Sequence, residues 1–199
     1  MAEIKSALEI ALEKTAGIEG DKETLKANEY KNDGKRLASR FLSDNEEKVD
    51  VSGELKSRAD AEGRNVKEGF LHTILANLSL PTDDTYPGRI KKLEEGVHHV
   101  VKDKKSVSHL FQQIDQFFKQ YLQTRDQVGE QLKQQYEPQL REKERQLAKQ
   151  MGSQIRLTAE SDPEYMNLLH KNLARLEEQY SQALVQVKDE LTGLFNSRR

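Results

Sequence analysis

The stretch SDPEYMNLLHKNLARLEEQYSQALVQVKDELTGL, residues 161–194, decides the fold class of this chain. Ser161 or Asp162 can cap a helix that begins at Pro163, because proline is favoured at the first helical position. Apolar residues then recur every seven positions with partners three residues later, which is typical of a helix that packs along one face. The candidate packing or interface residues on this helix are Met166, Leu169, Leu173, Leu176, Tyr180, Val187 and Leu191.

A second long helix is predicted before it, over residues 106–151. Its first part, residues 107–122, carries the densest apolar stripe of the sequence, and a thinner stripe continues to the end. Pro138 predicts a kink because it removes one backbone hydrogen bond, and Gly152 is a suitable residue to follow the helix. A connection of about ten residues allows the two helices to run antiparallel. We therefore predict an all-α, elongated helical protein with a long C-terminal antiparallel helical hairpin that is coiled-coil-like.

A short amphipathic helix is predicted at residues 3–15, before Gly17 and Gly20 interrupt the pattern. A helix of fewer than about 15 residues is marginal alone in water, so its apolar face must dock on the chain itself or on a partner. We interpret residues 1–20 as an N-terminal arm. Its interface candidates are Ile4, Leu8 and Leu12.

The following region is predicted to be helical but unevenly packed. Residues 26–35 are polar and contain Gly34, which indicates weak packing or mobility. Ser52 is the expected N-cap of a further helix, whose glycines each cost about 1 kcal/mol relative to alanine. Its second part, residues 66–78, has a dense apolar stripe that must be buried. The predicted parts are 1–20 (arm), 21–80 (helical region), 81–88 (loop) and 89–199 (long helix plus C-terminal helix).

The composition excludes several classes of function. The chain has 199 residues and no cysteine, so disulfides, thiol catalysis and cysteine-ligated metals are excluded. It has 32 basic and 34 acidic residues, without the basic stripe that nucleic-acid binding requires. No apolar run reaches the roughly 18 residues of a membrane span, and the acidic N-terminal segment differs from a secretory signal. We expect a cytoplasmic protein that binds neither nucleic acid nor membranes.

The best catalytic-looking pattern is Glu95-x-x-His98, the carboxylate–imidazole pair of di-iron helical bundles. Such sites need a second pair of the same kind, and no other histidine follows a glutamate at this spacing. A site formed by His98, His99 and His109 has no defined ligand spacing. The sequence also contains neither a Gly-x-Ser-x-Gly motif nor a phosphate-binding glycine-rich loop. We therefore expect no catalytic residues, no metal and no cofactor.

Two stretches of the sequence are similar to a known family. The opening Glu-Ile-Lys-Ser at residues 3–6, continuing to residue 15, resembles the N-terminus of a family of uncharacterised bacterial cytoplasmic proteins. Residues 136–180 resemble a later part of the same family. The resemblance implies a domain of unknown function without assigned catalytic residues. It also implies that the N-terminal helix is a defined element, which favours a docking role.

The expected function is a non-enzymatic cytoplasmic protein–protein interaction or scaffold protein that acts through amphipathic helices. Its expected partner is another protein or a second copy of the chain. The alternative is a helical bundle that binds a metal or a small ligand near Glu95, His98, His99 and His109. An atypical nucleic-acid binder is a third hypothesis.

Overall fold

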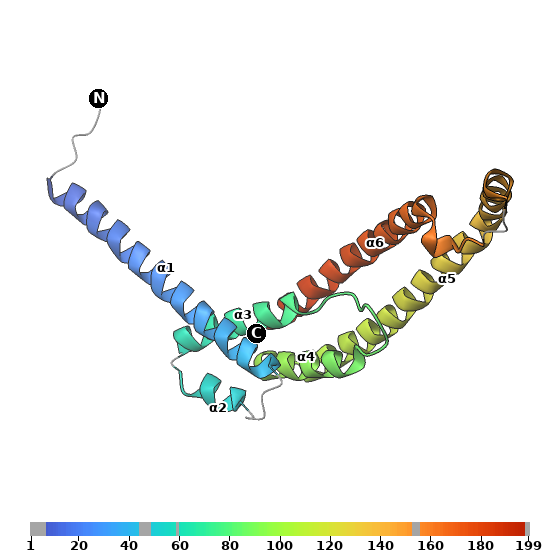
Figure 1. Cartoon of the computed structure of the whole chain (residues 1–199). Helices are drawn as coiled ribbons and strands as arrows, with labels where there is room; N and C mark the ends of the chain where they lie inside the picture. Colours follow the sequence, from blue (N-terminus) through green and yellow to red (C-terminus); the bar gives the residue numbers. More distant parts are fainter. Residues whose placement is uncertain (1–6, 44–48, 59, 153–155, 198–199) are drawn as a thin grey trace. The chain divides into compact units, whose positions relative to one another are not determined.

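The computed structural model describes residues 7–43, 49–58, 60–152 and 156–197, without the side chains of residues 7–21 and 60 (Figure 1). These residues form six α-helices and no strand, which confirms the all-α prediction. No helix within this part of the chain combines the length and the apolar character needed to cross a membrane. The helices are α1 (Ala7–Leu42), α2 (Val51–Lys56), α3 (Asp60–Ala76), α4 (Pro87–Val100), α5 (Lys104–Met151) and α6 (Pro163–Asn196), with a 3₁₀ turn at Ala159–Ser161.

The chain divides into two compact units, which we describe one at a time. The first unit combines residues 1–78, 91–107 and 194–199. The second unit combines residues 79–90 and 108–193. As a division into domains, the four parts predicted from the sequence stay a prediction.

The helix α1 continues through Gly17 and Gly20, so the break predicted there is wrong. A glycine inside a helix lowers helix propensity by about 1 kcal/mol but does not remove a backbone hydrogen bond, as proline does. The helix is stabilised further along by packing against α3. The interruption in the apolar pattern therefore marks a change of composition rather than an end of the helix.

The predicted weak packing of residues 26–35 is wrong for its later part, from Lys31 to Gly34, where α1 crosses α3 (Figure 1). Gly34 is buried, and a Cβ atom added to it would overlap the backbone of Val66. On the facing helix, a Cβ atom added to Gly69 would overlap the backbone of Lys31. The two helix backbones therefore touch directly at a pair of glycines. Polar side chains flank the crossing, with the Tyr30 hydroxyl donating to Glu62 at 2.6 Å.

The expected N-cap at Ser52 is wrong, since Asp50 caps α2. The Asp50 carboxylate accepts a hydrogen bond from the backbone N–H of Gly53 at 2.9 Å. The helix predicted here is also divided, because α2 ends at Lys56 and α3 begins at Asp60. Aspartate and serine are both good N-caps, so the sequence alone does not choose between neighbouring candidates.

The predicted loop at 81–88 differs slightly from the structure, since Pro87 and Gly88 form the first turn of α4. The C-terminal part also contains one helix more than predicted. Residues 101–103 separate α4 from α5, and the Asp103 carboxylate accepts a hydrogen bond from the backbone N–H of Ser106 at 3.1 Å. A capping carboxylate therefore starts α5 as a separate helix.

In the second unit, aromatic side chains connect α5 and α6 in antiparallel order. The ring of Tyr180 lies 4.9 Å from that of Phe117 and 5.1 Å from that of Tyr121. Further from these contacts, the rings of Tyr136 and Tyr165 lie 5.4 Å apart. Later residues of α5 thus contact earlier residues of α6. Whether this pair forms a regular coiled coil stays a prediction.

The ends of these two helices agree with their sequence signals. Gly152 follows α5 with a φ of 68°, a backbone conformation that favours glycine. Asp162 caps α6 by accepting a hydrogen bond from the backbone N–H of Glu164 at 3.0 Å. Pro138 lies inside α5, and the helix continues on both sides of it.

Candidate functional site

The interface candidates predicted on α6 differ in burial. Leu191 is fully buried and Leu176 is 9% exposed, so both pack within the chain. The other five are half-buried, which leaves part of each apolar side chain at the surface: Met166, Leu169, Leu173, Tyr180 and Val187.

The interface candidates of the N-terminal helix cannot be compared in the same way. Ile4 lies outside the described residues. Leu8 and Leu12 lie in α1, in the part of the helix whose side chains are not described. The docking role predicted for all three stays a prediction.

An open groove of about 480 Å³ lies along α5 and α6 in the second unit, and we call it the interhelical groove. Its apolar lining is formed by Tyr165, Leu169 and Leu173 of α6. Gly129 of α5 also lines it, and a Cβ atom added there would meet nothing within 4 Å. The groove is therefore open partly because α5 presents a glycine where a side chain could have filled the space.

The rim of the interhelical groove carries both signs of charge. Lys133 donates to the Glu160 carboxylate at 2.8 Å, and this hydrogen bond lowers the pKa of Glu160 below its usual range. Arg125 donates to the backbone carbonyl of Thr82 at 2.5 Å, which holds its guanidinium in place. Asp126 and Glu130 add two further carboxylates to the lining.

A polar cluster that was not predicted from the sequence lies beside the groove. Lys143 donates to the carboxylates of Asp162 at 2.7 Å and of Glu164 at 2.8 Å. The Tyr136 hydroxyl donates to the Asp162 carboxylate at 3.0 Å, so this buried group has several partners. Hydrogen bonding from Lys143 lowers the pKa of both Asp162 and Glu164. The cluster connects the two helices. The sequence identifies Asp162 as a helix cap, but it does not show that this aspartate faces Lys143 of α5.

The histidines of the alternative hypothesis do not form a metal site in the described residues. His98 Nε2 lies 3.3 Å from a carboxylate oxygen of Glu94, four residues earlier, rather than pairing with Glu95. His109 is exposed and belongs to the second unit, whereas His98 and His99 belong to the first. No three histidine, aspartate or glutamate side chains in the described part of the chain could hold a metal ion together. The metal form of the alternative therefore has no ligand set there.

His99 instead takes part in a separate cavity of the first unit. Its Nδ1 lies 3.0 Å from the Ser52 hydroxyl, and its ring meets that of Phe41 edge-on at 5.8 Å. The cavity has a volume of about 330 Å³ and also involves α2 and α3. No single stretch of the sequence predicts this cavity, because its lining residues come from positions 52–67 and 99.

Comparison with known proteins identifies a family. The model of a family of unknown function (DUF6657) matches residues 52–193, more than two thirds of the chain. The opening residues 3–15 lie outside the matched range. Neither the curated proteins nor the solved structures include a match to this sequence.

Proposed function

The chain belongs to the family of unknown function DUF6657, and we propose that it is a non-enzymatic protein that binds another protein through its amphipathic helices. The observation that carries this proposal is the interhelical groove, where Leu169 and Leu173 keep part of their apolar surface exposed. An apolar floor surrounded by charged residues matches the anatomy of protein–protein interfaces.

The occupant that we propose for the groove is an amphipathic helix of a partner protein. Such a helix places apolar side chains spaced three and four residues apart into a groove between helices. Its own charged residues then meet the rim, where Lys133 and Arg125 alternate with carboxylates. A second copy of this chain could supply the helix as well, and the experiment below distinguishes the two sources.

Replacement of Gly129 by leucine tests the proposal most directly. The new side chain enters open space in the groove without removing any contact, and leucine favours a helix more than glycine does. We expect Gly129→Leu to fold normally and to lose binding of the partner that the wild-type chain captures. Affinity capture with mass spectrometry identifies the partner, and calorimetry with that partner then measures the loss, which we expect to be at least about tenfold.

Gly193→Leu is the matched control, since a Cβ atom there also meets nothing within 4 Å and the residue does not line the groove. Light scattering of the same proteins measures self-association. If the wild-type chain is a dimer that Gly129→Leu dissociates, a second copy occupies the groove. If Gly129→Leu and Gly193→Leu bind every captured partner as the wild type does, the groove is not the binding surface.

We further propose that the N-terminal helix is a second docking element and that α5 and α6 pair as a coiled coil. The resemblance of residues 3–15 to bacterial cytoplasmic proteins supports the first point and a bacterial, cytoplasmic origin. The seven-residue spacing on α6 supports the second. Removal of residues 1–20 in the same capture experiment tests the N-terminal helix, because partners that depend on it are lost while groove partners are retained.

A further inference from the structure

We propose that the cavity formed by α2, α3 and α4 in the first unit binds a small phosphate-bearing anion. The cavity is independent of the interhelical groove, since all its lining residues belong to the other unit. Its volume of about 330 Å³ is near the lower end of the range for small-molecule sites, which fits a small metabolite. The lining residues are Ser52, Leu55, Lys56, Arg58, Gly63, Lys67 and His99.

The charge of the lining points to an anion. Lys56 and Lys67 line the cavity, and neither has an ion-pair or hydrogen-bond partner among the described residues. Among the described residues, the lining includes no carboxylate. Two ammonium groups at one cavity repel each other, so an anion that contacts both is stabilised by each of them. Lysine is a common ligand for phosphate, which it meets as a point charge.

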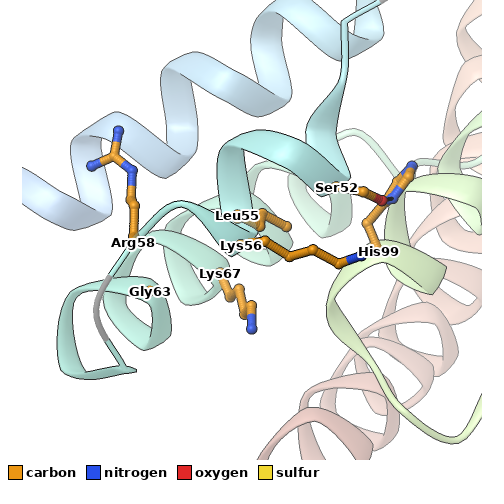
Figure 2. Close-up of a pocket in the computed structure, with 7 residues that line it drawn as sticks. All are labelled: Ser52, Leu55, Lys56, Arg58, Gly63, Lys67 and His99. Carbon is orange, nitrogen blue, oxygen red and sulfur yellow. Dashed lines mark hydrogen bonds between the residues drawn. The ribbon is translucent and has the colours of Figure 1, made fainter.

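The third cation of the lining is already compensated. Arg58 donates to the Asp33 carboxylate of α1 at 2.9 Å, and Figure 2 shows its side chain turned toward that helix. Lys56, in contrast, extends from α2 toward His99 in the same view, and Lys67 projects from α3. We therefore assign anion binding to the two lysines and a structural role to Arg58.

His99 contributes a polar group of fixed orientation rather than a third charge. Burial lowers the pKa of its imidazole, and Lys104 acts in the same direction, whereas Glu95 and Asp50 oppose the shift. The Ser52 hydroxyl and the edge-on Phe41 ring both contact the imidazole. When the Ser52 hydroxyl donates to Nδ1, the proton of the neutral ring lies on Nε2, which is then a hydrogen-bond donor.

The choice of phosphate over a carboxylate follows from this set of donors. Two lysines from different helices and an imidazole reach a ligand from three elements, α2, α3 and α4. A tetrahedral phosphate presents oxygens in several directions, whereas a carboxylate presents two in one plane. Inorganic phosphate and acetate are therefore the probes that separate the two ligand classes.

The test is a titration of the full chain with inorganic phosphate at constant ionic strength, followed by calorimetry and by NMR of the histidine rings. We expect saturable binding, a shift of the His99 ring signals, and at least about tenfold weaker binding of acetate. The variant Lys56→Gln/Lys67→Gln should weaken phosphate binding at least about tenfold, because it removes two charged donors. Circular dichroism verifies that this variant folds.

A matched control is Lys22→Gln/Lys26→Gln, which changes the net charge equally at exposed positions of α1 outside the cavity. This control should bind phosphate as the wild type does. The proposal is overturned if phosphate does not saturate the protein in the millimolar range, or if both double variants weaken binding equally. Acetate binding as tight as phosphate binding would overturn the assignment of the ligand class.

Discussion

Two pairs of helices in this protein make contact in opposite ways. In the first unit, α1 and α3 cross at Gly34 and Gly69, where no side chain separates the backbones. In the second unit, the rings of Tyr136 and Tyr165 fill the space between α5 and α6. Glycine therefore marks the closest contact in one pair, whereas Gly129 of the other pair faces open space.

The difference determines how deeply the apolar side chains are buried. At the α1–α3 crossing, α4 adds a third helix, and a Cβ atom added to Gly96 would lie 2.8 Å from the Ile74 side chain. Phe70 and Ile74 are accordingly 0% exposed. Leu169 and Leu173, on the α5–α6 pair, remain half-buried. Helices that approach from several sides enclose a side chain, whereas a pair whose backbones are held apart leaves its seam partly open.

The largest loss of stability is expected at the most deeply buried side chains of the first unit. Phe70→Ala should destabilise the protein by about 3–5 kcal/mol, because it leaves a cavity in a closed core. Leu173→Ala should cost about 1 kcal/mol, since its side chain already contacts solvent. Urea denaturation of both variants measures the two free energies of unfolding. Equal losses would contradict the difference in burial between the two helix pairs.

The next largest effects on stability are expected at the glycines, which either lie at a helix contact or face open space. Gly69→Ala should destabilise by about 2–3 kcal/mol, because the added Cβ meets the backbone of Lys31, which cannot rotate away. Gly129→Ala should stabilise by about 0.5–1 kcal/mol, since alanine favours a helix and meets no neighbour. The same denaturation experiment measures both changes. A loss of stability for Gly129→Ala would show that α5 and α6 approach each other more closely there.

The polar cluster of the second unit should make its stability depend on pH. The pKa values of Asp162 and Glu164 are lowered in the folded state by Lys143. Their contribution is therefore complete above the unfolded pKa of about 4, and it is lost as the pH falls through the folded values. Lys143→Met should lower the melting temperature at pH 7, and this difference from the wild type should shrink toward zero in acid.

Arg141→Met is the control for this prediction. Arg141 pairs with Glu137 one helical turn away on an exposed face, so its removal should change the melting temperature little at any pH. Melting curves followed by circular dichroism between neutral and acidic pH provide the measurement. A constant difference between the wild type and Lys143→Met at all pH values would refute the role of the cluster.

The smallest effect is expected on the outer part of α1, before it reaches the crossing. Leu25 is 63% exposed, so Leu25→Ala should change the free energy of unfolding by less than about 0.5 kcal/mol. Alanine also retains the helix propensity of the position. A loss near that of Phe70→Ala in the denaturation experiment would mean that this part of α1 packs as tightly as the crossing.

Local chemistry explains why part of the fold was predictable. The end of α5 at Gly152 and the start of α6 at Asp162 and Pro163 depend on residues within one helical turn of each other. The apolar stripes of both helices likewise follow from helical periodicity alone. The capping residue of α2 was misassigned, because Asp50 and Ser52 are equivalent by local preference and packing decides between them.

The candidate sites were less predictable than the helices. The half-buried leucines of α6 were identified from spacing, but the groove beside them requires Gly129 from another helix. From the sequence, His99 belongs only to the alternative hypothesis of a metal or small-ligand site, whereas in the structure it lines a cavity with Lys56 and Lys67. Lysines on a polar helix have no distinguishing sequence signal when the residues that surround them are distant in the chain.

By itself, the sequence determined that this protein is all-α, where its long helices lie and which of their faces are apolar, because these properties depend on neighbours three to seven residues away. Only the tertiary structure decided what the glycines do. Gly34 and Gly69 each lower the helix propensity of their own segment, yet they are the residues at which α1 and α3 touch. The physical reason is that the loss of helix propensity at a glycine depends only on its own helix. The close packing that the glycine allows depends on the backbone of a second helix, and Gly34 and Gly69 are 35 positions apart in the sequence.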